Sequence, residues 1–590
     1  MTKQARKPTA RRTAKPAATR KTRRRTPPRN PNALMRDNLI ALQANPDRTQ
    51  PDTRLVGRIQ AQIEKYGLTA YFQAIGETMP ADAGVETQRD LSIATTIPRE
   101  GSTQLTWWDC IRARQAQPLR TFRPTSLPEL REIVTQAATQ KLTVKAVGSG
   151  HSFADVAITP DYLIDTHGLN KPLDLDVQVL RSVPHADADT ANLVEIECGI
   201  TVHELNDWLW EQRGKALINM GGYDGQTVLG VVSTATHGSG VQFGPLADFV
   251  KSITLVAGDG TVYRIEPSNG ITDANKWRMR HPDIVLKQDD AWFDAVRVGI
   301  GCMGVVYSVI VALRNKFMLK EERTLSTWSQ IKQDLRTHEV LSANSHYEIL
   351  VNPYKTDRDY TCLVTRRNAT TEPPSPTQKR RNFWVELIAQ LPLLNKVLVD
   401  ILNRVPELTP SIINKGLAAL AGTYIDRSYR VFNIGHANDV RAYGSEIGVP
   451  LTQVIAATER ILSITEQRAR VGRAYLSSPF SLRFVNASSA YLAMMHNTPT
   501  CMIEFPMLEG TYGGRELLRE IEHALYALGG RPHWGLLNFV QGRELVEAMY
   551  PLFGAWNAVR KQLDPDNIFR NAFTERCGVT QPQFMRTNLF

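Results

Sequence analysis

A glycine-rich turn between two β-type runs constrains the fold of this chain most strongly. Residues 142–147 read as a strand, and a Gly-Ser-Gly turn at 148–150 follows directly, before His151 and a second apolar run at 162–165. Glycines placed after a strand let backbone N–H groups approach a phosphate closely. The dinucleotide fingerprint G-x-G-x-x-G is only half met, because Phe153 stands at the third glycine and no helical pattern follows. We therefore predict a phosphate-binding turn that differs from the ordinary NAD loop.

Helical and strand patterns alternate along the rest of the chain. The Ser-Leu-Pro-Glu run at 126–129 is a capping box that predicts the start of a helix. Thr201 begins a second capping box, and Gly214 ends the helix that this box predicts. Residues 252–265 read as a hairpin turning at Asp-Gly, and residues 296–313 as a strand pair broken by glycines. This alternation predicts a layered fold of helices and strands.

Four segments of the chain resemble one group of flavoproteins. Residues 147–152 (Val-Gly-Ser-Gly-His-Ser) are similar to the pyrophosphate loop of the vanillyl-alcohol-oxidase superfamily, whose FAD-binding domain is of the PCMH type. Residues 230–240, 298–306 and 564–571 are similar to later stretches of its sugar-1,4-lactone oxidase and alditol oxidase branch, which is D-arabinono-1,4-lactone oxidase-like. Because the four segments keep the family's order, the resemblance covers nearly all of the chain except its first hundred residues.

The resemblance implies FAD as the cofactor and no metal. It places the following residues at the cofactor: Val147, Gly148, Ser149, Gly150, His151, Ser152, Gly230, Ser233, Thr236, His237, Gly238, Gly301, Gly304, Val306 and Asn571. In the family the histidine of the first loop is bonded covalently to the flavin 8α-methyl group, which implies such a bond at His151. The second linking cysteine of bicovalent relatives has no counterpart at 222–225, so a single histidyl bond is expected. The alternative is that His151 merely caps a turn.

The segments expected to hold the substrate depart from the family pattern. The family's P-x-E-x-R-F strand reads Pro-Phe-Ser-Leu-Arg-Phe at 479–484, so Arg483 is kept and Ser481 replaces the glutamate. The family's H-W-[GA]-K reads His-Trp-Gly-Leu at 533–536, so a leucine replaces the lysine. We expect Arg483 to stabilise negative charge, His533 to accept or orient the hydroxyl proton, and Ser481 to line the site. The loss of two charged groups predicts a less polar or a differently arranged substrate site.

The resemblance predicts an α+β protein with a PCMH-type FAD-binding domain, made of two α/β subdomains, and an α+β cap that holds the substrate. The expected parts are a basic disordered tail (1–31), an N-terminal extension (32–102), the FAD-binding domain (103–316), a lactone-oxidase-like cap domain (317–560) and a C-terminal segment that returns to the FAD-binding domain (561–577).

The expected function is that of a FAD-dependent oxidase acting on a CH–OH group. The substrate would be a small lactone, polyol or secondary alcohol that transfers a hydride to flavin N5, with O2 reduced to hydrogen peroxide. A dehydrogenase of the same fold, with a quinone or cytochrome acceptor, is one alternative. A nucleic-acid- or membrane-associated protein on a catalytically degenerate flavoenzyme fold is another. The basic tail and the missing glutamate and lysine motivate this second alternative. Two alternatives concern the site itself: Ser481 and Leu536 are out of register by one residue, or His533 is a core histidine beside Trp534.

Positive charge is concentrated at the N-terminus. Residues 1–31 hold 12 of the 70 lysines and arginines and none of the 59 acidic residues, so the tail is expected to be disordered. It would serve an anionic partner, either nucleic acid or a membrane surface, or only solubility.

Two further features bear on localisation and cofactors. No apolar signal segment follows the arginines, and charges interrupt the apolar run 383–402, which is expected to form a buried or a surface-lying helix. A cytoplasmic or peripherally membrane-associated protein is therefore expected. The six cysteines are widely spaced, which argues against a metal site or a redox disulfide.

Overall fold

The computed structural model describes residues 58, 61–62, 101–102, 105–181, 190–377, 379, 395–436 and 440–581. The expected basic tail, most of the expected extension and the first part of the apolar run 383–402 lie outside these residues. The last part of that run lies in helix α12 (Asn395–Arg404), where Leu398, Ile401 and Leu402 are buried. Among the described residues, no helix is both long and apolar enough to cross a membrane.

A small parallel sheet begins the first domain. Its strands lie in the order β3-β5-β4, and both pairings are parallel. Helix α4 connects β3 to β4, and it packs by Leu130, Val134 and Ala137, which are fully buried. Ser126 caps α4 by accepting a hydrogen bond from the Glu129 backbone, which confirms the predicted helix start. The bounds are β3 (Arg120–Phe122), α4 (Leu127–Gln140), β4 (Val144–Val147) and β5 (Tyr162–Asp165).

A seven-stranded sheet forms the second layer of this domain. Its order is β11-β10-β9-β12-β7-β6, and β8 pairs with the far end of β12. The antiparallel β9–β10 pair confirms the predicted hairpin. The bounds are β6 (Pro172–Leu173), β7 (Leu193–Glu197), β8 (Lys215–Leu217), β9 (Val250–Val256), β10 (Val262–Glu266), β11 (Val285–Gln288) and β12 (Val305–Asn315). A separate two-stranded sheet joins β1 (Trp107–Trp108) and β2 (Gln115–Ala116).

The predicted strand pair over 296–313 is wrong. Only β12 forms there, preceded by the end of α8 (Asp290–Val296) and a glycine-rich loop. Gly301 and Gly304 have φ angles of +68° and +112°, which a strand does not allow. A Cβ atom at Gly304 would lie 2.6 Å from the Val256 carbonyl oxygen, so this loop requires glycine to pass close to β9.

Short capped helices connect these strands. Thr201 and Glu204 form the predicted capping box of α5, and Gly214, with a φ of +62°, ends the π-helical turn that continues it. Thr227 caps α6 by accepting from the Gly230 backbone. The bounds are α5 (Val202–Trp208), its π-helical turn (Leu209–Arg213), α6 (Val228–Ser233) and α7 (Ala274–Arg280).

The C-terminal segment closes the first domain. Helices α17 (Arg543–Met549), α18 (Phe553–Leu563) and α19 (Ala572–Arg576) follow the cap, and α18 packs on α8. The Val144 backbone N–H, in β4, donates to the Ile568 carbonyl at 2.8 Å. Because α18 already begins at Phe553, we propose that the returning segment begins earlier than the predicted 561–577.

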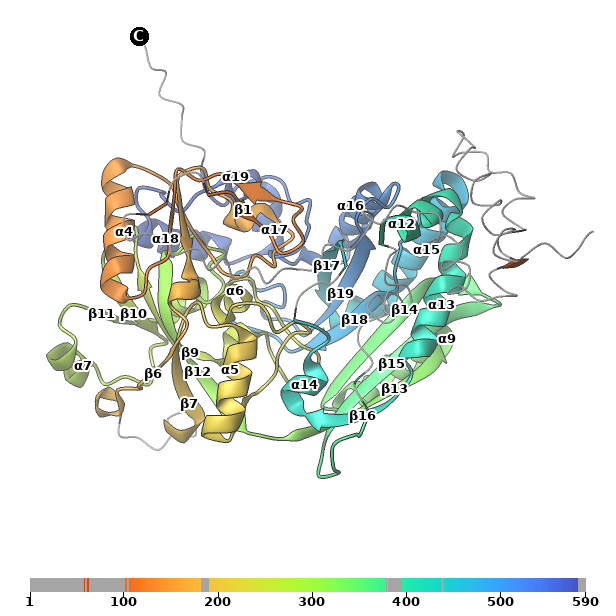
Figure 1. Ribbon diagram of the computed structural model, residues 1–590, viewed down its shortest axis with the longest axis horizontal. Helices are drawn as coiled ribbons and strands as arrows, with labels where there is room; N and C mark the ends of the chain where they lie inside the picture. The colour runs from red at the N-terminus through yellow and green to blue at the C-terminus, as the bar shows by residue number, and fades with distance from the viewer. Residues whose placement is uncertain are drawn as a thin grey trace, which may run out of the picture. The chain divides into compact units, whose positions relative to one another are not determined.

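An eight-stranded sheet organises the cap, in the order β16-β13-β15-β14-β18-β19-β17-β20. Helices α9, α15 and α16 pack on the face of this sheet opposite its charged side chains (Figure 1). The strands are β13 (Met318–Thr327), β14 (His346–Thr356), β15 (Asp359–Thr370), β16 (Gly422–Arg427), β17 (Ala442–Pro450), β18 (Phe480–Val485), β19 (Thr500–Leu508) and β20 (Arg531–Pro532). The helices are α9 (Trp328–Thr337), α10 (Glu339–Ser342), α13 (Thr409–Leu420), α14 (Ser428–Phe432), α15 (Val454–Gly472) and α16 (Gly514–Tyr526).

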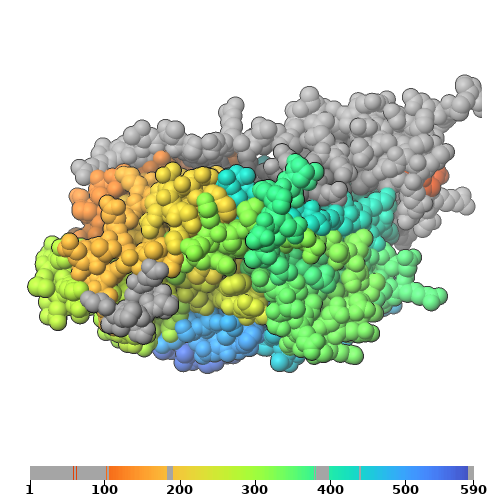
Figure 2. Space-filling model, turned by 90° about the horizontal axis from the view of Figure 1, so that it is seen from below, coloured from red at the N-terminus to blue at the C-terminus, as the bar shows by residue number. Residues whose placement is uncertain are grey.

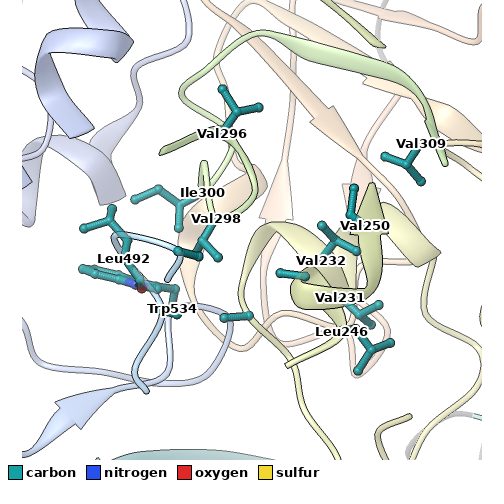
Figure 3. Packing of buried hydrophobic residues seen from close by; sticks show 14 of the residues in the cluster. Val231, Val232, Leu246, Val250, Val296, Val298, Ile300, Val309, Leu492 and Trp534 are labelled. Carbon is teal, nitrogen blue, oxygen red and sulfur yellow. The ribbon is translucent and has the colours of Figure 1, made fainter. Parts of the chain in front are cut away.

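The hydrophobic core of the first domain also contains residues from the cap part of the chain. Leu492 and Trp534 lie beside Val298 and Ile300, and the Trp534 indole N–H donates to the Leu492 carbonyl at 2.8 Å (Figure 3). In the space-filling view the orange and yellow segments of the first domain lie against the green and teal segments of the cap (Figure 2). Because Trp534 packs in this core, the preceding residue, His533, lies beside the first domain.

Candidate functional site

A first cavity lies among the loops of the first domain. Its wall is formed by the end of β4 with the following turn, by α6 and the turn after it, and by the glycine-rich loop before β12. Among the residues predicted to contact FAD, those that line it are Val147, Gly148, Ser149, Gly150, His151, Ser152, Gly230, Ser233, Thr236, Gly301, Gly304 and Val306. Three segments that are far apart in the sequence thus meet at one cavity.

The glycines of this cavity are required by close packing. A Cβ atom at Gly148 would lie 2.2 Å from the Thr227 hydroxyl oxygen, so the turn after β4 touches the cap of α6 directly. Gly150 and Gly301 both have a φ of +68°, where a side chain is strained. Small residues and exposed backbone amides at such loops are the features that hold a pyrophosphate. The cavity therefore has the small residues and backbone groups that FAD binding requires.

Three residues predicted to contact FAD do not line this cavity. His237 faces a second cavity, and a Cβ atom at Gly238 would lie 2.4 Å from the Asn219 side chain. Asn571 caps α19, and its amide donates to the carbonyls of residues 155, 156 and 158. Loop residues 156–158 line the cavity, so the hydrogen bonds of Asn571 hold part of the cavity wall although Asn571 does not line the cavity itself.

Lys145 is a cavity residue that the sequence reasoning missed. It is 2% exposed within β4, and its ammonium donates to the Gly301 carbonyl at 3.0 Å. Burial lowers its pKa, against the opposing effects of Cys302 and Asp564. The sequence feature that could have identified it is a single lysine in an otherwise apolar strand directly before the glycine turn. The side chain links that turn to the loop before β12.

His151 lies where the first cavity meets the second. Its imidazole lines both cavities, as do Thr236 and His533. Burial lowers the pKa of His151 to about 4, with a further contribution from His436. Among the described residues, no side chain or backbone group makes a hydrogen bond to its ring. The structure thus presents a neutral imidazole at the junction, without the capping bond that the alternative interpretation required.

The second cavity is lined by charged side chains on one face of the cap sheet. Because side chains alternate along a strand, β14 points Tyr347 and Ile349 to the helix-covered core and Glu348 to the cavity. In β19, Ile503 and Phe505 face the core while the carboxylate between them faces the cavity. The charged members of this lining are Arg323, Glu348, Arg367, Glu446, Arg483 and Glu504.

Arg483 is the centre of the charges on this face. Its Nε lies 3.1 Å from Glu348 Oε1, and its Nη1 lies 2.9 Å from Glu504 Oε2. Burial alone would lower the pKa of Arg483, but the two carboxylates outweigh this effect and raise it. Its Nη2 makes no hydrogen bond to the described residues, so this end of the guanidinium is left for a ligand in the cavity.

Glu504 provides a carboxylate next to Ser481. The two residues are direct partners in the β18–β19 pairing, and the Ser481 hydroxyl is buried without a hydrogen-bond partner among the described residues. Of the two expected alternatives, this charged lining favours a differently arranged site over a less polar one. Glu504 lies opposite Ser481 because of the register between β18 and β19, and the spacing of residues in the sequence does not reveal this register.

Two carboxylates of this lining, Glu446 and Glu504, have shifted pKa values. Burial raises the pKa of Glu504, and Glu446 and Glu348 add to this against Arg483. Burial also acts to raise the pKa of Glu446, but His237, whose Nε2 lies 3.3 Å from Glu446 Oε1, contributes most to lowering it to about 2. The site therefore holds one carboxylate that stays ionised and one that exchanges a proton more readily.

His533 is neutral and oriented. Burial lowers its pKa to about 4, although Glu446 opposes this. Its Nδ1 accepts a hydrogen bond from the Gly535 backbone at 3.0 Å, which places the ring proton on Nε2. The imidazole of His533 lines both cavities. Leu536, which stands where the family has a lysine, also lines both cavities.

Buried neutral histidines make the protein sensitive to acid. His346 and His533 are 1% and 6% exposed, and burial lowers the pKa of each from 6.5 to about 4. The unfolded chain binds these protons first, so stability is full above pH 6.5 and falls as the pH drops toward 4, by up to about 3 kcal/mol for each group. We expect the midpoint of thermal unfolding to fall over this pH window. His346→Gln should flatten the fall, whereas His523→Gln, at an exposed position, should leave it unchanged; an equal effect of both would contradict the assignment.

Comparisons with known proteins agree with this arrangement. Residues 309–577 match the family model of D-arabinono-1,4-lactone oxidase, and residues 118–266 match that of an FAD binding domain. L-gulono-1,4-lactone dehydrogenase of Mycobacterium tuberculosis is 29% identical over 469 residues, which is 78% of this chain and 96% of that protein. L-gulonolactone oxidase of Scyliorhinus torazame is 28% identical over 468 residues, 78% of this chain and 95% of that protein. The crystal structure of cholesterol oxidase from B. sterolicum shares the fold, with a TM-score of 0.63, 13% identity, and coverage of 82% of this chain and 98% of that one.

Proposed function

Because the chain belongs to the FAD-dependent sugar-lactone oxidoreductases, we propose that it oxidises a CH–OH group of a small polar molecule held in the second cavity. The observation that carries this proposal is the junction of the two cavities at His151, Thr236 and His533. A cofactor in the first cavity and an alcohol in the second would meet there. The proposed acceptor of the electrons is O2, which is reduced to hydrogen peroxide.

FAD is the cofactor that fits the first cavity, and when bound it supplies the hydride acceptor. The turn at 148–150, α6 and the loop before β12 would hold it through backbone amides. Lys145 keeps two of these loops together. Leu536 and His533 line both this cavity and the second one.

We assign the binding of the substrate hydroxyl and the removal of its proton to side chains on the charged face of the cap. The free Nη2 of Arg483 would bind the hydroxyl oxygen and stabilise negative charge that develops on it. Glu504, whose raised pKa brings proton exchange closer to neutral pH, is the group that we assign to accept the hydroxyl proton. His533 is neutral with its proton on Nε2, so it orients the substrate as a donor. Ser481 and Glu504 together would bind a neighbouring hydroxyl group.

A polar substrate follows from this lining. Six charged side chains line the second cavity, and the Ser481 hydroxyl is buried there without a hydrogen-bond partner among the described residues, so an apolar alcohol such as a sterol would make no hydrogen bonds to this lining. We therefore propose a lactone or polyol with several hydroxyl groups. The secondary-alcohol class is retained only for molecules that carry further polar groups.

Substrate-dependent bleaching of the flavin under anaerobic conditions tests this function. We expect an L-gulono- or D-arabinono-1,4-lactone or a polyol to bleach the flavin, and a sterol or a simple secondary alcohol not to. Bleaching by the sterol alone would overturn the proposed substrate class. No bleaching by any of the four classes would favour a binding protein on a flavoenzyme fold.

The relative from M. tuberculosis favours a second candidate, a dehydrogenase, because that protein is named as one. Mixing the reduced protein with O2 or with oxidised cytochrome c in a stopped-flow instrument separates the two. An oxidase is reoxidised rapidly by O2 with release of hydrogen peroxide. A dehydrogenase is reoxidised slowly by O2 and rapidly by the cytochrome or a quinone.

We also propose a single covalent bond from His151 to the flavin. The neutral imidazole at the cavity junction supports it, and the nearby loop 222–225 offers no cysteine for a second bond. After precipitation with acid, the flavin should stay with the wild-type chain and be released from His151→Ala. His167→Ala, a histidine in the next loop, is the control and should keep its flavin. Release from the wild type would refute the bond without refuting flavin binding.

A further inference from the structure

A cluster of two histidines and one carboxylate lies beside the loop that carries His151. His203 is on α5, Asp224 is in the loop between β8 and α6, and His436 follows α14 in the cap. Their ligand atoms all lie within 4.8 Å of one another. We propose that these three side chains bind a divalent transition-metal ion, with Zn²⁺ as the best match. The proposal is independent of the proposed reaction.

The distances in the cluster are those of a metal site without its ion. His203 Nδ1 lies 3.1 Å from Asp224 Oδ2, and His436 Nδ1 lies 3.1 Å from Asp224 Oδ1. In a tetrahedral zinc site with bonds of about 2.0–2.1 Å, neighbouring ligand atoms are about 3.3 Å apart. Each imidazole nitrogen thus lies close to this spacing from the carboxylate, and an ion would bind after the two rings, whose ligand atoms lie within 4.8 Å of each other, adjust around it.

The backbone holds the three ligands together before an ion arrives. The His203 N–H donates to the Asp224 carbonyl at 2.8 Å, and the Gly225 N–H donates to the His436 carbonyl at 3.0 Å. Ile434 N–H donates to the Gly222 carbonyl at 2.7 Å. A Cβ atom at Gly225 would lie 2.2 Å from the His436 carbonyl oxygen, so glycine permits this close contact. Little conformational entropy is then lost when a metal binds.

The carboxylate is oriented by a neighbour, as ligands in metal sites usually are. Asn433 Nδ2 donates to Asp224 Oδ2 at 2.7 Å, and the Asp224 side chain is only 3% exposed. The side chains of His203 and His436 are 48% and 65% exposed. Solvent can therefore reach the ion and supply the fourth ligand as water.

An ion at this place would join the first domain to the cap. It would connect α5 and the loop 222–225 with the cap loop 433–436. Gly222, Tyr223 and Ile434 of these loops also line the second cavity. We therefore assign the ion a structural role, in which it fixes this wall of the cavity.

Zinc titration of the flavin-containing protein, after dialysis against a chelator, tests the site. We expect one Zn²⁺ per chain by calorimetry and atomic absorption, and a higher midpoint of thermal unfolding with the metal. His203→Ala and His436→Ala should each weaken binding at least about 100-fold, and Asn433→Ala about 10- to 100-fold. Both histidines are largely exposed, so these variants should fold, and their flavin absorbance and circular dichroism check this.

His281→Ala is the matched control. His281 Nε2 lies 3.1 Å from Asp176 Oδ2, also at the surface, but this pair lacks the second histidine of the site. The control should bind Zn²⁺ as tightly as the wild type. The proposal is overturned if the wild type takes up no Zn²⁺ at micromolar concentrations, or if His203→Ala and His436→Ala bind it as tightly as the control.

Discussion

Replacing Arg483 with alanine is expected to lower kcat/KM for the true substrate by about a thousandfold. Among the described residues, Arg483 is the one cation that contacts both Glu348 and Glu504, and its Nη2 makes no hydrogen bond to them. Removing it takes away the stabilisation of developing negative charge and leaves two carboxylates facing the same alcohol. Loss of a single preorganised donor at such a position typically costs about 10²- to 10³-fold. Steady-state kinetics with the substrate found by flavin bleaching measures the effect.

Two further variants make this test specific. Arg483→Lys keeps the charge but cannot contact both carboxylates, so it should fall between the wild type and Arg483→Ala. Arg366→Ala is the matched control, because Arg366 lies on the same sheet with its guanidinium over the Tyr347 ring on the opposite face. It should keep nearly full activity. Flavin content shows whether each variant is folded, and full activity of a folded Arg483→Ala would remove Arg483 from the site.

Gly148→Ala is expected to prevent stable binding of FAD. Its new methyl group would lie 2.2 Å from the Thr227 hydroxyl oxygen, which caps α6 by accepting from the Gly230 backbone. Displacing Thr227 costs the cap about 0.5–2 kcal/mol, and overpacking costs about 1–3 kcal/mol. Since Gly230 lines the first cavity, we expect the affinity for FAD to fall at least about tenfold. The flavin absorbance per chain measures the loss.

The control for this change is Gly472→Ala. A Cβ atom at Gly472, at the end of α15, meets nothing within 4 Å, so this variant should bind FAD normally. The double change Gly148→Ala with Thr227→Ala removes the clash and should restore part of the flavin. Normal flavin content in Gly148→Ala alone would show that the turn after β4 does not hold the cofactor.

The charged face of the cap was only partly predictable from the sequence. Arg483 was recognised because it keeps a position in a local pattern of six residues. Glu348 and Glu504 were missed, although each is a lone charge in an apolar strand, because nothing local says which strands are neighbours. Because the pairing of the strands could not be predicted, a less polar site was one of the two alternatives that the sequence left open. Ser481 replaces the family's glutamate, while Glu504 supplies the carboxylate from the paired strand.

The sequence by itself determined the features that depend on a few neighbouring residues. The Ser126 cap of α4, the capping box of α5, the β9–β10 hairpin and the glycine turn after β4 all follow from local backbone chemistry, and the structure has each of them. The order of the flavin-binding stretches was also readable, because each is a contiguous motif.

Only the tertiary structure decided which distant residues meet. It brought Trp534 to the core of the first domain, and His436 to His203 and Asp224. It also turned 296–313 into a loop and a single strand, since positive φ angles at Gly301 and Gly304 are compatible with a glycine-rich sequence but not specified by it. Packing between segments hundreds of residues apart selects these contacts, and the free energy that selects them is absent from any local pattern.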